Sequence, residues 1–190
     1  KGVELCISPK IDGINSTTEY LDGAIYNSRT RGRSGNAFNI TERMSKVMPE
    51  SIDFKDRFIT AAEMVISRAH VEQFNQIMNP NEKLFVTCRG SAMSILRRED
   101  IPEECISFLQ PFVFRTNYGT TLSEGLAKAR LLGFNVVPFE KLYEYEDTLE
   151  EKGFHKAFDT IKYDYHYYKE GMTSRIQLQE IKKIGLLVYY

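Results

Sequence analysis

Alternating apolar and polar residues along this chain predict short strands separated by turns. The pattern predicts strands over residues 3–9 and 14–30, the second folded into a hairpin at Asp22-Gly23, a pair that tolerates positive φ. Further apolar runs predict strands at residues 57–66, 84–87, 105–114, 135–138, 159–169 and 184–190. The strands are therefore spread over the whole chain.

Helical spacing of apolar residues, together with end signals, predicts helices between these strands. Ser67 can cap a helix that runs to about Met78, and Gly133 can end one that starts near Leu122. Another predicted helix covers residues 37–47 and ends before Pro49. Two more cover residues 91–98 and the Glu-rich residues 140–152. The order of elements predicts an α+β fold with antiparallel sheets flanked by helices, and no linker divides it.

Composition fits one compact domain and excludes a broadly basic protein. The 190 residues are 42% hydrophobic, and the formal net charge is only −1. Any contact with nucleic acid must therefore come from local clusters, namely Arg29, Arg31 and Arg33, or Arg97 and Arg98. Solvated surface is the alternative interpretation of such clusters.

Cysteine and histidine positions indicate neither a metal site nor a disulfide framework. Cys6, Cys88 and Cys105 are odd in number, far apart and set in apolar runs, and the three histidines show no ligand spacing. We also find no signal peptide and no long apolar span. We therefore predict a cytoplasmic protein with no membrane partner and no metal-ligating residue of its own.

The segment Ser8-Pro9-Lys10-Ile11-Asp12-Gly13 is the first candidate for chemistry. It places Lys10 at the end of a predicted strand, just before a glycine-tight turn. An amine among apolar residues loses its proton more readily, and a neutral lysine amine is a nucleophile. A solvated surface turn is the alternative, because such a segment also occurs by chance.

Two further side chains stand out by their surroundings. Arg31 follows a predicted strand in a Gly-flanked loop, where its guanidinium can grip phosphate or ribose oxygens, although an ordinary β-turn arginine is the alternative. Glu63 lies within an apolar strand and needs a partner there. That partner is either a ligand or the cation of an inter-strand salt bridge.

These segments, followed by Arg89-Gly90-Ser91-Ala92-Met93, resemble in order and interval the adenylation domain of NAD-dependent DNA ligases. The resemblance runs from about residue 3 to about residue 180. It implies an ATP-grasp-like nucleotidyltransferase fold for residues 1–190, as one adenylation domain within a larger ligase. The Arg89 segment distinguishes this family from ATP-dependent ligases and capping enzymes, which share the lysine motif but not this segment.

The resemblance also implies an activity. Lys10 would attack the α-phosphorus of NAD, expel nicotinamide mononucleotide, carry AMP as a phosphoramidate and pass it to the 5′-phosphate of a DNA nick. Asp12 and Gly13 complete the lysine motif, and Arg31 and Arg89 match arginines near the ribose and phosphates. By the same resemblance Glu63 binds the ribose hydroxyls or supports the Mg²⁺ expected in the family.

The resemblance also implies two residues that enclose the adenine. Ile11 matches the residue that covers one face of the base, and Phe112 is our choice for the other face, with Phe108 and Pro111 as alternatives and plain core packing as another explanation. Ser8 replaces the family's usual glutamate, and a hydroxyl is a weaker acceptor for the adenine edge.

The final motifs depart further from the family pattern. The best register places the fourth motif at Asp164 to Lys169, with Tyr165 in place of glycine and Lys169 as the lysine that meets the phosphates. A sheet face rich in tyrosine is the alternative for this run. The fifth motif's second lysine does not occur before Tyr190, and Arg33 stands where the family has aspartate.

Two functional hypotheses follow. The first is an active adenylation core, whose nicotinamide-recognising helical segment is expected before Lys1 and whose OB-fold, zinc-finger and helix-hairpin-helix domains are expected after Tyr190 or in a second subunit. Nicked double-stranded DNA would be contacted through those domains. The second is a catalytically weakened module that binds nucleotide or nucleic acid, supported by Ser8, Arg33, Tyr165 and the lack of the fifth-motif lysine up to Tyr190.

Overall fold

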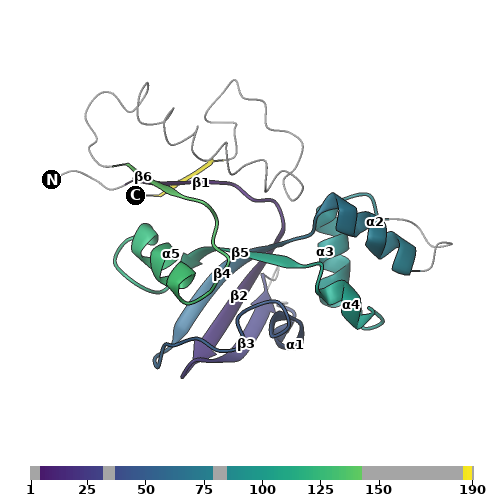
Figure 1. Ribbon diagram of the computed structural model, residues 1–190, viewed down its shortest axis with the longest axis horizontal. Helices are drawn as coiled ribbons and strands as arrows, with labels where there is room; N and C mark the ends of the chain where they lie inside the picture. The colour runs from purple at the N-terminus through teal and green to yellow at the C-terminus, as the bar shows by residue number, and fades with distance from the viewer. Residues whose placement is uncertain (1–4, 32–36, 79–84, 143–185, 190) are drawn as a thin grey trace, which may run out of the picture.

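The chain folds into two antiparallel sheets (Figure 1). The computed structural model describes residues 5–31, 37–78, 85–142 and 186–189. One sheet has the order β6-β1-β7, formed by Glu140–Leu142, Leu5–Pro9 and Leu186–Tyr189. The other has the order β3-β2-β4-β5, formed by Ala24–Thr30, Ile14–Leu21, Phe58–Val65 and Gln110–Thr116. The predicted α+β class with antiparallel sheets is confirmed.

Helices accompany the four-stranded sheet. In Figure 1, α2, α3 and α4 form one group, and α5 lies apart from them beside β5. The helices are α1 (Thr41–Met44), α2 (Arg68–Ile77), α3 (Cys88–Arg97), α4 (Glu103–Ile106) and α5 (Leu122–Leu131). The cap predicted at Ser67 is confirmed, because its hydroxyl accepts a hydrogen bond from the backbone N–H of His70 at 3.1 Å.

Burial alternates along β2 and separates the two faces of the four-stranded sheet. Ile14, Ser16, Thr18 and Tyr20 are buried, and Tyr20 meets Phe134 edge-to-face with ring centroids 5.4 Å apart. The residues between them on β2, Asn15, Thr17 and Glu19, are half-buried or exposed. One face therefore belongs to the core, and the other is open enough to carry polar side chains.

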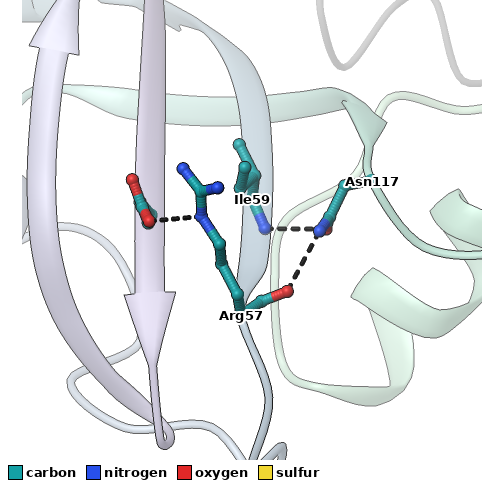
Figure 2. Close-up of polar contacts among 4 residues, drawn as sticks. Arg57, Ile59 and Asn117 are labelled. Carbon is teal, nitrogen blue, oxygen red and sulfur yellow. Dashed lines mark hydrogen bonds and ion pairs between the residues drawn. The ribbon is translucent and has the colours of Figure 1, made fainter.

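Asn117 replaces missing backbone partners at the start of β4 (Figure 2). Its side-chain oxygen accepts from the Ile59 N–H at 2.8 Å, and its amide nitrogen donates to the Arg57 carbonyl at 3.0 Å. Arg57 also pairs with the Glu19 carboxylate on the neighbouring strand. These contacts fix one end of the four-stranded sheet. The turn between β1 and β2 lies at the opposite end.

The hairpin at Asp22-Gly23 and the final strand are confirmed, but one predicted strand is wrong and another was predicted to begin too early. Residues 85–87 form no strand, because Thr87 caps α3, which begins before the helix predicted at 91–98. Of the strand predicted at 105–114, residues 110–114 lie in β5, whereas Cys105 and Ile106 belong to α4, which starts after Pro102 with two glutamates in its first turn. A short apolar run does not by itself distinguish helix from strand.

Three other predicted elements are shorter or different. The helix predicted at 37–47 is reduced to α1, and residues 135–138 contribute only one parallel bridge, between Val136 and Val113. The predicted Glu-rich helix begins instead as β6, and its residues from 143 onward lie outside the described residues. The strand predicted at 159–169 also lies outside them.

Candidate functional site

The lysine motif forms the turn between β1 and β2, which belong to different sheets. Lys10 is exposed, and Ile11 beside it is buried. A Cβ atom on Gly13 would lie 2.3 Å from the Met64 carbonyl oxygen of β4. Only glycine lets the turn pass this close to the backbone of β4, so the position of Lys10 depends on Gly13.

An ion pair ties this turn to helix α3. Arg89, in the first turn of α3, donates to the Asp12 carboxylate at 2.8 Å. The Thr87 hydroxyl caps the same turn by accepting from the Gly90 N–H at 3.0 Å. The helix end thus carries a guanidinium to the lysine turn.

Four residues form a row across the open face of the four-stranded sheet. Asn15 of β2 is directly opposite Glu63 of β4, which is directly opposite Phe112 of β5. On the other side of Asn15, its carbonyl oxygen accepts from the Arg31 N–H at 3.1 Å, just beyond the end of β3. Directly opposed residues share a face, so Arg31, Glu63 and Phe112, each predicted separately, belong to one surface.

Glu63 is the electrostatic centre of this row. Burial raises the pKa of its carboxyl, and the repulsion of Asp12 adds to that rise. Three contributions lower the pKa: a hydrogen bond from the Asn15 amide, one from the Gly13 backbone, and the charge of Arg89. Together they do not cancel the rise. Asn15 donates to one carboxylate oxygen, Oε1, at 3.3 Å. A ligand that donates hydrogen bonds to Glu63 therefore gains from an acceptor that is only partly satisfied.

The structure narrows the choice of aromatic residue. Phe108 stacks on His70 with ring centroids 4.7 Å apart and an interplanar angle of 13°, so its ring is engaged away from the row. Pro111 is opposite Met64 and therefore points to the other face of the sheet from Phe112. Phe112 is the one of the three in the row with Glu63, although it is itself 6% exposed and part of the core.

The remaining predicted residues are placed as follows. Ser8 lies in β1 opposite Leu187 of β7, and it is only 2% exposed. Lys169 lies outside the described residues.

The family model of the NAD-dependent DNA ligase adenylation domain matches residues 1–187. The chain belongs to this family. It is 29% identical over 179 residues to the DNA ligase of Borreliella burgdorferi, covering 90% of this chain and 27% of that protein. It is 28% identical over 175 residues to the DNA ligase of Mycoplasma mycoides subsp. mycoides SC, covering 88% of this chain and 26% of that protein. The adenylation domain thus spans about a quarter of the length of these relatives.

The adenylation domain shows no ready-made metal centre in the part of the chain that the structure describes. No group of three or more His, Cys, Asp or Glu side chains there could hold an ion. Asp12 is nevertheless close enough to Glu63 for its charge to raise the pKa of the Glu63 carboxyl. Mg²⁺ is usually bound through one or two carboxylates together with substrate phosphates, so an ion that arrives with a nucleotide needs few ligands from the protein.

Asn15 is the site residue that the sequence analysis missed. Its side-chain amide donates to Glu63, yet it belongs to no recognised motif. The available signal is its position on the open face of β2, where an amide replaces the β-branched or aromatic residues that strands favour. Among the described residues, no helix is long and apolar enough to cross a membrane.

Proposed function

We propose that this adenylation domain transfers AMP from NAD to Lys10 and, in the intact protein, onward to the 5′-phosphate of nicked double-stranded DNA. The convergence of Asp12, Arg89 and Glu63 at the turn that carries Lys10, with the Arg31 backbone paired to Asn15 just beyond that turn, is the observation that supports this proposal. Arginines and a carboxylate on one surface suit a ligand with both phosphates and ribose hydroxyls. NAD has both.

In the proposed reaction, the neutral Lys10 amine attacks the α-phosphorus of NAD. A nitrogen–phosphorus bond forms, the bond from phosphorus to the oxygen of nicotinamide mononucleotide breaks, and the amine proton passes to solvent. Arg89 and Arg31 balance the charge that grows on the phosphate oxygens, and Glu63 accepts from the ribose hydroxyls. Mg²⁺, when bound, neutralises phosphate charge.

The proposal also covers the fold, the adenine contacts, the DNA and the location of the protein. Residues 1–190 make up one adenylation domain with an ATP-grasp-like nucleotidyltransferase fold, and Ile11 and Phe112 enclose the adenine. The DNA is held mainly by other domains or by a second subunit. The protein works in the cytoplasm, where NAD and DNA are both available.

The proposal is tested by intact mass. The intact protein incubated with NAD and Mg²⁺ should gain the mass of one adenylyl group, and peptide mapping should place it on Lys10. Lys10→Ala should gain nothing, whereas Lys55→Ala should behave as wild type. An adduct on another lysine, or one that persists in Lys10→Ala, would overturn the assignment.

A second candidate function is a module that binds nucleotide without transferring AMP. The burial of Ser8 supports it, because its hydroxyl is poorly placed to replace the glutamate acceptor expected near adenine. Binding of AMP by calorimetry without any adduct, under conditions where a control ligase is adenylated, would favour this alternative.

A further inference from the structure

We propose that Asn15 is a positioning residue that orients the Glu63 carboxylate for binding the nucleotide ribose. The proposal rests on the function proposed above, and it adds a residue that no motif assigns. Asn15 itself need not touch the substrate.

The geometry supports this role through the Asn15 side chain. Its amide Nδ2 donates to Oε1 of Glu63 at 3.3 Å, and the Gly13 backbone donates a second hydrogen bond to the same carboxylate. The Asn15 carbonyl oxygen accepts from the Arg31 N–H at 3.1 Å, but this backbone contact forms with any side chain at position 15. The Asn15 side chain therefore acts on the orientation of Glu63.

Strand stability alone does not account for Asn15. Asparagine is depleted in strands, where β-branched residues fit better. Nearby on the same face of β2, exposed Thr17 is a residue of the favoured kind. Asn15 weakens its strand, yet its side chain binds Glu63. Such a residue is expected at a functional site, where function competes with stability. Valine at position 15 should therefore leave the strand equally or more stable.

The charges around Glu63 determine how the loss of the Asn15 side chain would change the pKa of Glu63. Asp12 from the lysine turn opposes ionisation of Glu63, Arg89 from α3 favours it, and burial opposes it. Removing the Asn15 amide takes away one of the groups that favour the charged form. Glu63 then remains protonated to a higher pH, and a protonated carboxyl accepts hydrogen bonds from ribose more weakly.

The experiment compares Asn15→Val, Asn15→Asp and the control Thr17→Val in the intact protein. Single-turnover adenylation with NAD is measured from pH 5.5 to 9, beside thermal unfolding. We expect Asn15→Val to lose about three- to tenfold in kcat/KM at the acidic end and less at the alkaline end, with an unchanged or higher Tm. Asn15→Asp should lose more, because it adds a like charge, and Thr17→Val should match wild type.

A second measurement separates this inference from the proposed function. The Glu63 carboxyl is titrated by ¹³C NMR in the free protein, with Glu63→Gln used for assignment. Its midpoint should move upward in Asn15→Val and stay in place in Thr17→Val, whether or not the protein is adenylated. An unmoved midpoint, or a wild-type pH profile for Asn15→Val in an active enzyme, overturns the positioning role. Absence of adenylation in wild type overturns only the proposed function.

Discussion

Arg89 donates to the Asp12 carboxylate at 2.8 Å and so joins the first turn of α3 to the lysine turn. The Arg89 side chain is 60% exposed, and exposed ion pairs contribute about 0–1 kcal/mol to stability. The pair is therefore a weak element of the fold. The charge of Arg89 also acts on Glu63, so we expect the pair to affect nucleotide binding more than folding.

We expect Arg89→Ala to reduce adenylation by about 100-fold or more while lowering the free energy of unfolding by no more than about 1 kcal/mol. Loss of the guanidinium removes a cation from the proposed phosphate site. It also raises the pKa of Glu63 further, because the charge of Arg89 lowers that pKa in the wild-type protein. Activity should therefore fall more steeply toward acidic pH.

Single-turnover kinetics with NAD and chemical denaturation measure the two effects of Arg89→Ala. Lys46→Ala is the matched control, because Lys46 pairs with Glu103 at 2.7 Å in a similarly solvent-accessible ion pair on other elements. Equal, near-normal rates for both variants would show that Arg89 serves only as a surface partner of Asp12.

For Glu63→Gln we expect nucleotide binding to weaken about 10- to 100-fold, because hydrogen bonds to a charged acceptor are worth about 1.5–3 kcal/mol. Folding should not suffer, since the amide oxygen of glutamine can still accept from Asn15. Calorimetry with AMP and thermal unfolding separate the two quantities, and Glu72→Gln, at an exposed position on α2, is the control.

The pH dependence of the Glu63 effect has a definite sign. Burial raises the pKa of Glu63 in the folded state, so the folded protein binds this proton more tightly than the unfolded chain does. Ionised Glu63 then costs stability, and that cost grows as pH rises from the ordinary glutamate pKa of 4.5 through the raised value. The stability of Glu63→Gln relative to wild type should rise over this range, and a difference that fell instead would indicate a structural ion pair.

Local signals in the sequence predicted the elements that begin or end at a capping residue or a tight turn. Ser67 caps α2, and the turn at Asp22-Gly23 adopts positive φ at both residues, as expected. The apolar run from Cys105 was assigned to a strand, whereas Pro102 and the two glutamates after it start a helix there. Apolar content alone did not decide between these structures.

Three of the four residues of the row were predicted from the sequence, but their arrangement on one face of the sheet was not. Arg31, Glu63 and Phe112 were found by motif, and only strand pairing shows that they share one face. Asn15 was missed because its importance comes from its side-chain hydrogen bond to Glu63, 48 residues away in the sequence. Cross-strand register is a long-range property that local pattern does not determine.

We expect Gly13→Ala to destabilise the fold by about 1–3 kcal/mol, because the added Cβ would lie 2.3 Å from the Met64 carbonyl oxygen and the turn must move. That movement displaces Lys10, so adenylation of the folded protein should fall as well. Gly133→Ala is the control: its φ of +87° also strains an alanine, but nothing lies within 4 Å of the new Cβ. Both variants should lose stability, and only Gly13→Ala should lose activity in the folded fraction.

The last prediction concerns Lys169, which lies outside the described residues and is assigned by its position five residues after Asp164. If this segment is the fourth motif, its ammonium stabilises charge that grows as the α-phosphorus becomes five-coordinate, so it acts mainly in the transition state. Lys169→Ala should then slow single-turnover adenylation by about 100-fold or more and leave AMP affinity nearly unchanged. Lys162→Ala is the control from the same segment. Equal, near-normal rates for the two variants would mean that the motif has been placed in the wrong register and that another cation serves the phosphate.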